Sequence, residues 1–336
     1  MRKTEKVTFD IIRAKSGWKG KDLLLIAIPD ESWDDPYFIA DSYYPFSRVV
    51  FYLTYELNPW REDDFNLFIT DIGFIQRPGV DYRTNCVLSL EGDFIIRENG
   101  EKTIEKIPGA GIEGENSGRG RLYGMTIINN HVYAYGEARQ LYRRSDDGIW
   151  TMLDENIYQP IKIVSFQNIA IIFDVKGLRE DAIYIVDTAG CINFWNGTTM
   201  RLIEQVEGIS LVSILIEDED TIWICGNRGT LLRGNAKSGF TRMPGVKGTH
   251  NFVSMAKFKD KIYLASHGGG RDVGAYVYEN NTLTKLVTGL TPETQYDAHT
   301  VTCTDEDLWI VGLKDILHFD GSAWERIDFP GNPPIR

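Results

Sequence analysis

The sequence predicts an all-β fold: a single β-propeller of four-stranded antiparallel blades. Strand-like runs come in pairs joined by polar turns, as in Arg121 to Ile128 and His131 to Tyr135 around Asn129-Asn130. Two such runs form a hairpin. The pairs also recur, with separations of 51, 39, 40 and 46 residues between the aromatic residues of successive second strands: Tyr133, Tyr184, Trp223, Tyr263 and Trp309. Units repeating every 40–50 residues, with almost no helical periodicity, are typical of a propeller.

Each repeat contains a second hairpin, so the unit has four strands. After Ile222 to Gly226, for example, comes Gly229 to Arg233, followed by a closing strand around Phe240. Five units are clear, at about 121–153, 161–206, 209–244, 250–288 and 298–329, and a sixth spans 65–107. The first 60 residues hold enough strands for an irregular seventh blade that is rich in acidic and aromatic residues.

We therefore expect one propeller domain over residues 1–336, with seven blades as the main count and six as the alternative. The last unit contains runs for all four of its own strands. Closure of the propeller by an N-terminal strand at Lys6 to Ile12 is compatible with this pattern but is not required by it.

The repeat resembles a known family. Gly229-Thr230-Leu231-Leu232-Arg233, with Gly239 to Pro244 after it, is similar to the repeat of photosystem II assembly-factor-like propellers in the BNR/Asp-box group. Leu141 to Trp150 resembles a shortened Asp-box of pattern SxDxGxxW, with Gly148 one position early and Trp150 two positions early. The resemblance covers about residues 85–330 and implies a propeller, but no activity, because such repeats occur in enzymes and in binding proteins.

Composition and short motifs argue against several classes of function. The net charge of −12 disfavours binding to nucleic acid or to an anionic membrane. The basic start of the chain is not followed by the apolar stretch of a signal peptide, so we expect a cytoplasmic protein. Four cysteines without a CxxC pair are expected to be buried in strands, and five histidines without metal-ligand spacing predict no metal site: His131, His250, His267, His299 and His318.

Two glycine motifs are expected to be loops. Gly109 to Gly114 matches GxGxxG, but a loop-like composition follows it where a dinucleotide site needs a helix. His267-Gly268-Gly269-Gly270 is similar to the oxyanion loop of lipases, but the chain has no GxSxG nucleophile motif. We therefore predict no cofactor.

The N-terminal segment combines acidic and aromatic residues in a way that suits recognition of a basic partner. Aromatic side chains supply contact area, and carboxylates steer a cationic partner toward the site. The alternative is that the aromatics fill the edge of an irregular blade and the acids solvate it. The residues predicted to contact the partner here are Trp33, Asp34, Asp35, Tyr43, Tyr44 and Trp60.

The turns predict a difference in charge between the two ends of the blades. Turns joining first to second strands are acidic and include Glu217, Glu219, Asp305 and Asp307, with Glu180-Asp181. Turns joining second to third strands, and the links between blades, carry Arg139, Arg228, Arg271, Lys314, Arg119 and Lys247. We expect a basic protein partner to approach the acidic end.

The interpretation that follows is a monomeric, non-enzymatic propeller that binds another protein. A bacterial toxin-neutralising (immunity) protein and an assembly adaptor both fit it. The alternative is a carbohydrate-active hydrolase or lyase with a central pocket, because the Asp-box group includes sialidases. An enzyme of that kind needs inward carboxylates about 5–10 Å apart, whereas a binding protein needs an exposed apolar patch.

Overall fold

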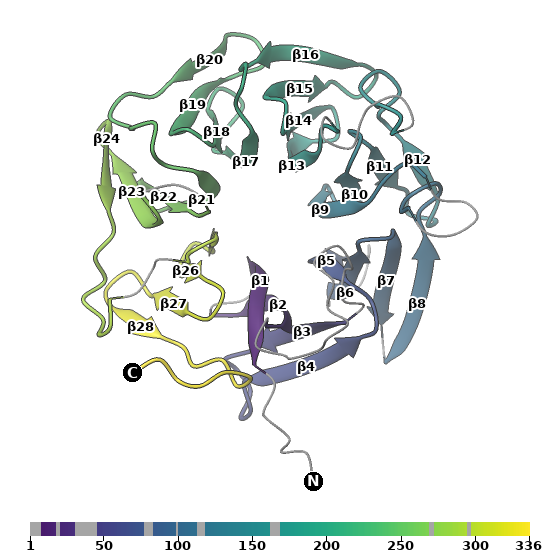
Figure 1. Ribbon diagram of the computed structural model, residues 1–336. Coiled ribbons are helices and arrows are strands. Elements are labelled where there is room, and N and C mark those ends of the chain that lie inside the picture. Colours follow the sequence, from purple (N-terminus) through teal and green to yellow (C-terminus); the bar gives the residue numbers. More distant parts are fainter. Residues whose placement is uncertain are drawn as a thin grey trace. The chain divides into compact units, whose positions relative to one another are not determined.

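The protein is an all-β, seven-bladed propeller with four-stranded antiparallel blades (Figure 1). The computed structural model describes residues 8–17, 21–30, 46–76, 83–98, 100–112, 118–161, 169–268, 272–293 and 297–336. Every regular element within these ranges is a strand. A search of the same residues finds no helix with the length and apolar character needed to cross a membrane.

In each sheet the neighbouring strands are consecutive in the chain. Blades 1 and 2 contain β1 (Phe9–Ser16), β2 (Leu23–Pro29), β3 (Ser47–Tyr52), β4 (Trp60–Phe65), β5 (Ile69–Gln76), β6 (Arg83–Ser89), β7 (Asp93–Glu98) and β8 (Glu101–Lys106). Blades 3 and 4 contain β9 (Leu122–Ile128), β10 (His131–Gly136), β11 (Leu141–Arg144), β12 (Trp150–Met152), β13 (Ile172–Arg179), β14 (Ala182–Asp187), β15 (Cys191–Trp195) and β16 (Met200–Gln205).

The last three blades follow the same order. Blade 5 contains β17 (Leu211–Ile216), β18 (Ile222–Gly226), β19 (Thr230–Asn235) and β20 (Gly239–Arg242). Blades 6 and 7 contain β21 (Phe252–Phe258), β22 (Lys261–Ser266), β23 (Gly274–Glu279), β24 (Thr282–Lys285), β25 (Thr300–Cys303), β26 (Leu308–Val311), β27 (Ile316–Phe319) and β28 (Trp324–Arg326). The count of seven is confirmed, and the six-blade alternative is wrong.

The chain divides into two compact units. One comprises residues 1–68 and 253–336, and therefore blade 1 together with nearly all of blade 6 and blade 7. The other comprises residues 69–252 and contains blades 2 to 5. The candidate site described below lies within the second unit.

The second strand of each blade is buried on both faces, which explains its continuous apolar sequence. All six residues of β14 are buried, as are all four of β26. The five aromatic residues that set the repeat are each at most 7% exposed. Burying one large apolar side chain contributes roughly 1.5–3 kcal/mol, so these strands are a major source of stability in each blade.

Buried aspartates link neighbouring blades within the second unit. Asp71 follows a register shift in β5, and Asp174 occupies the same place in β13. Each carboxylate accepts one hydrogen bond from the next residue and one from the first strand of the following blade: Asp71 from Met125 N–H and Asp174 from Ile214 N–H, both at 2.8 Å. A carboxylate that accepts backbone N–H groups satisfies donors that would otherwise be buried without a partner.

In the first unit, the C-terminal tail joins blade 1 through a side chain instead of an exchanged strand. β1 pairs with β2 of its own sheet, and blade 7 contains four consecutive strands. The buried Asn332 amide donates to the Phe9 carbonyl and accepts from the Phe9 N–H, each at 2.8 Å. Within the described residues, no N-terminal strand therefore joins the sheet of blade 7.

Candidate functional site

The first–second turns of blades 4 and 5 lie close together and are acidic. Glu217 to Asp220 are all exposed at the β17–β18 turn. The Glu217 carboxylate accepts a hydrogen bond of 2.6 Å from the Trp223 indole N–H, which fixes that side chain. Glu219 forms an ion pair with Arg179, which lies at the end of β13 in blade 4. This pair connects the acidic turns of two neighbouring blades.

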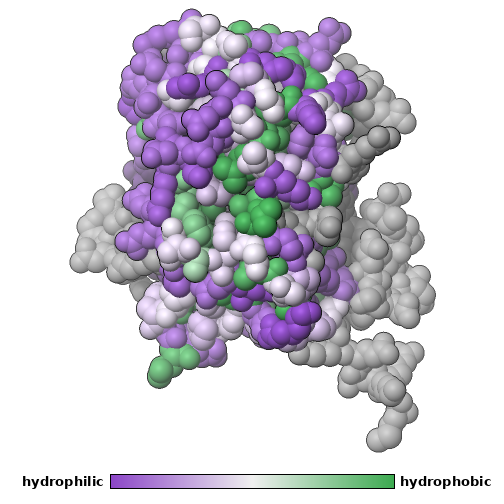
Figure 2. All heavy atoms as spheres, turned by 90° about the vertical axis from the view of Figure 1, so that its left-hand side faces the viewer, coloured by the Kyte–Doolittle hydropathy of each residue, from purple (hydrophilic) through white to green (hydrophobic). Residues whose placement is uncertain are grey.

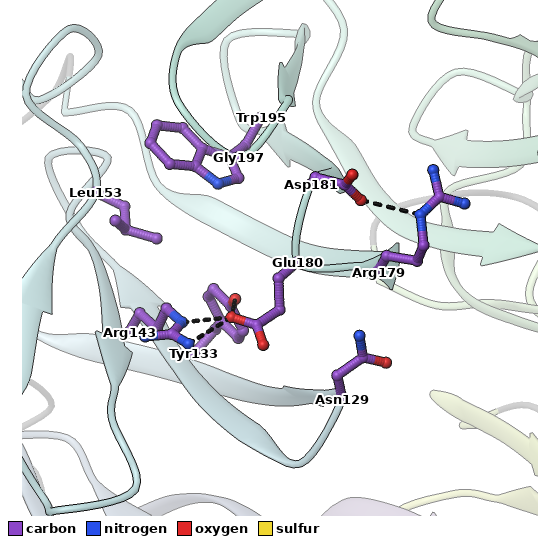
Figure 3. Close-up of a pocket in the computed structure, with 9 residues that line it drawn as sticks. All are labelled: Asn129, Tyr133, Arg143, Leu153, Arg179, Glu180, Asp181, Trp195 and Gly197. Atoms are coloured by element: carbon purple, nitrogen blue, oxygen red, sulfur yellow. Dashed lines mark hydrogen bonds and ion pairs between the residues drawn. The ribbon is translucent and has the colours of Figure 1, made fainter.

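A pocket of about 570 Å³ opens beside these turns, between blades 3 and 4 (Figure 3). Trp195, at the end of β15, and Leu153, just after β12, provide apolar walls. The Glu180 carboxylate points into the pocket from the β13–β14 turn. The pocket therefore combines an aromatic wall with carboxylate groups.

Glu180 is held by groups of the neighbouring blade. Its carboxylate accepts hydrogen bonds from Arg143 at 2.7 Å and from the Tyr133 hydroxyl at 3.3 Å, and lies 2.6 Å from His131 Nδ1. Burial, followed by the charge of Glu180, raises the pKa of Tyr133 to about 12, so this hydroxyl remains a donor. Burial alone would lower the pKa of Arg143, but its hydrogen bonds to Glu180 and Tyr133 outweigh that effect and raise it.

Asp181 is the more exposed carboxylate of the pocket. Its side chain is 60% exposed and pairs at 3.0 Å with Arg179, whose side chain is 51% exposed. Exposed pairs of this kind contribute little stability, so an incoming group can replace one partner at small cost. In the view of Figure 3, the Arg179 guanidinium lies on the far side of Asp181 from Trp195.

The opposite turns and links carry less free positive charge than the sequence suggests. Arg139 pairs at 2.6 Å with Asp187, which is fully buried, and Arg119 pairs at 2.5 Å with Asp154. Lys314 pairs with Asp10 and Asp30 within the first unit. Arg228 and Lys247 are exposed, and Arg271 lies outside the described residues.

Of the six predicted N-terminal contacts, Trp60 belongs to the described residues. Trp33, Asp34, Asp35, Tyr43 and Tyr44 lie outside the described residues. Trp60 is half-buried in β4, where its ring centroid lies 4.6 Å from that of Tyr52 and 5.9 Å from that of Phe329. Trp60 thus belongs to an aromatic cluster of the core and keeps only part of its surface for a partner.

The acidic turn of blade 7 requires one correction. Asp305 is exposed, as expected. Asp307 is only 3% exposed, and its carboxylate lies 2.6 Å from Nε2 of the buried His318. The other ring nitrogen of His318 lies 2.7 Å from Glu325. Asp307 therefore holds the interior of blade 7 together and does not present its charge to a partner.

The β3–β4 turn of blade 1 exposes two apolar residues that the sequence analysis did not single out. Tyr55 is 69% exposed, and Leu57 is fully exposed. The turn is braced by a Leu53 N–H to Pro59 carbonyl hydrogen bond of 2.7 Å and by a Glu56–Arg61 ion pair of 2.6 Å. In the sequence, this turn could have been identified by its apolar residues within a short polar segment. Elsewhere, the face drawn in Figure 2 is mostly hydrophilic, with hydrophobic residues in small groups.

The cysteines and one glycine motif agree in part with expectation. All four cysteines are free thiols; Cys86, Cys191 and Cys225 are buried, while Cys303 is half-buried. Among the described residues, no group of three or more His, Cys, Asp or Glu side chains could hold a metal ion. Gly109 and Gly111 have φ values of 78° and 89° in a turn, as a loop requires.

Comparisons with known proteins identify relatives in sequence and in fold. The chain is 28% identical to the Immune protein Tsi7 of Pseudomonas aeruginosa over 247 residues, which are 72% of this chain and 74% of that protein. No family model matches the chain.

Solved structures that resemble it include β-propellers, which agrees with the fold expected from the repeat. They include YCF48 bound to D1 peptide, with a TM-score of 0.53, 12% identity, and 85% of this chain and 86% of that chain covered. YCF48 from Cyanidioschyzon merolae has a TM-score of 0.55 and 15% identity, covering 78% and 85%. The WD40 propeller domain of Doa1 has a TM-score of 0.59 and 10% identity, covering 93% and 96%.

Proposed function

We propose that this chain is a non-enzymatic, protein-binding propeller that acts as an immunity protein by binding a basic effector. The observation that carries the proposal is the similarity to the Immune protein Tsi7 over 247 residues. That similarity extends over nearly three quarters of both chains, so it concerns the propeller as a whole and not a single repeat.

The surface features of the described residues support a protein partner. Exposed carboxylates on the turns of blades 4 and 5 steer a cationic partner and raise its association rate. The braced turn with Tyr55 and Leu57 offers apolar contact area on a preorganised loop. Loops on a rigid β scaffold are common sites of recognition.

The test is native co-purification from the source cell, with the bound species identified by mass spectrometry. We expect a single basic protein in a stable complex. The double variant Glu219→Lys/Asp220→Lys should slow association of that protein about tenfold at low salt and less at high salt. Capture of no protein, or an association rate that the double variant leaves unchanged at low salt, contradicts the proposal.

The Asp-box resemblance bears on the local conformation of a turn and not on binding of a partner. We infer that residues 145–150 form a divergent Asp-box turn, supported by the Ser145 hydroxyl, which accepts a hydrogen bond of 3.0 Å from Ile149 N–H. The Trp150 indole after it donates to Glu105 at 3.0 Å. The hydrolase alternative stays a prediction that these observations do not test.

A further inference from the structure

The pocket between blades 3 and 4 lies in a surplus of negative charge. The charged residues that line the pocket are two cations, Arg143 and Arg179, and two anions, so the lining itself has no net charge: the anions are Glu180 and Asp181. The turns of blades 3 to 5 at this end carry eight carboxylates in total: Asp146, Asp147, Glu180, Asp181, Glu217, Asp218, Glu219 and Asp220. Lys237 is the basic residue within these turns, and four arginines stand at the adjoining strand ends, so carboxylates still outnumber cations: Arg143, Arg144, Arg179 and Arg201. The potential at the pocket mouth therefore favours a cation over an anion.

The arginines that line the pocket are already engaged by carboxylates. Arg143 makes two close contacts with Glu180, at 2.7 and 2.5 Å. Arg179 contacts both Asp181 and Glu219. A carboxylate ligand would have to displace these internal partners, whereas a cation would add to the carboxylates without separating Arg143 from Glu180.

The walls of the pocket also select the kind of cation. The Trp195 indole lies on one side, and the carboxylates of Glu180 and Asp181 lie on the other (Figure 3). A planar guanidinium stacks on an indole face and donates in the same plane to carboxylates, which a compact ammonium does less well. The volume of about 570 Å³ is ample for one arginine side chain.

We propose that this pocket binds an arginine side chain of a protein partner, stacked on Trp195 and paired with Asp181. The inference deepens the proposed function, on which it rests, by naming the chemistry that the partner brings. Leu153 packs against the aliphatic part of the arginine, and Glu180, held by Arg143 and His131, forms the fixed floor of the pocket.

The pocket is tested with small probes, so the result does not depend on finding the natural partner. The probes are the blocked tripeptide Ala-Arg-Ala, its citrulline analogue, and Ala-Glu-Ala. Binding is followed by the indole N–H signal of Trp195 in a ¹H–¹⁵N NMR spectrum, assigned by its loss in Trp195→Phe. We expect a saturable shift with the arginine peptide, with a Kd on the order of 1 mM, and none with the other two.

Two matched variants separate a specific pocket from a general acidic field. Asp181→Asn should weaken binding of the arginine peptide about fivefold, whereas Asp218→Asn removes the same charge outside the pocket and should leave it nearly unchanged. Both side chains are exposed, so neither substitution threatens folding. No shift with the arginine peptide, an equal shift with the citrulline or glutamate peptide, or equal weakening by both variants would overturn the assignment.

The outcomes also separate this inference from the proposed function. If the chain captures a basic effector but Asp181→Asn binds that effector as tightly as wild type does, the pocket assignment fails and the immunity role stands. If the arginine peptide binds as expected but no effector is captured, the proposed function fails and the pocket stands.

Discussion

The stability of the protein should fall in acid because of His299, which precedes β25 in blade 7. Its Nε2 lies 2.7 Å from the Ile11 carbonyl, and its Nδ1 lies 2.8 Å from the Thr300 hydroxyl. A carbonyl can only accept, so Nε2 carries the proton and the Thr300 hydroxyl donates to Nδ1. The neutral ring thus has both of its hydrogen bonds, and a second proton would place a charge on a half-buried ring that is largely shielded from solvent.

The size of the effect follows from the pKa of this group. Burial lowers the pKa of His299 from 6.5 to about 4. Between these values the unfolded chain binds a proton that the folded protein does not, so the free energy of unfolding decreases as the pH decreases. The stabilisation that the neutral His299 ring gives the folded protein is complete above pH 6.5 and is lost as the pH falls toward 4. At about 1.4 kcal/mol per pKa unit, the loss is up to about 3 kcal/mol.

The assay compares wild type with His299→Gln by urea denaturation at several pH values from about 7 to about 4. Glutamine can still donate to the Ile11 carbonyl but does not titrate. The difference in unfolding free energy between the two proteins should shrink or reverse by up to about 3 kcal/mol as the pH falls. His267 lies nearby, with its ring centroid 6.2 Å away, and is present in both proteins. Parallel pH profiles would refute the reasoning.

Three further predictions concern stability and binding. Asn332→Ala leaves the Phe9 N–H without its partner and should lower the free energy of unfolding, measured by urea denaturation, by about 2 kcal/mol. The control Asn58→Ala changes an exposed side chain and should have little effect. Equal urea midpoints for the two variants would contradict the bridging role of Asn332. Asp174→Ala should lower the free energy of unfolding by about 2–3 kcal/mol in the same assay, because the Ile214 N–H loses a charged acceptor. An unchanged urea midpoint would show that this hydrogen bond between blades does not stabilise the fold. Leu57→Ser should leave stability unchanged but weaken binding of the co-purified protein about tenfold or more, and unchanged affinity would remove this turn from the interface.

The architecture could be predicted from the sequence because burial on both faces leaves a strong local pattern. Second strands such as Ala182 to Asp187 are continuous apolar runs, and their aromatic residues mark the repeat. The error at Asp307 has a physical cause. Asp307 directly precedes β26 and its side chain is buried against His318 of β27, whereas Asp305, two residues earlier in the same turn, faces solvent.

The site could be predicted only in part. The acidic turn Glu180-Asp181 is visible in the sequence, but its partners His131 and Arg143 belong to another blade. Their meeting depends on how two sheets pack, which no spacing along the chain encodes. Likewise, Trp195 ends a strand like several other aromatic residues, and only the space left beside Leu153 makes it a pocket wall.

Co-expression with the co-purified partner tests the central claim most directly. The partner is expressed in a host cell alone, together with the wild-type chain, and together with the Glu219→Lys/Asp220→Lys variant, and growth is measured. The account predicts that the partner alone arrests growth, that the wild-type chain restores it by forming a complex, and that the variant restores it less well. A partner that is harmless alone, or growth arrest that the wild-type chain does not relieve, would contradict the account.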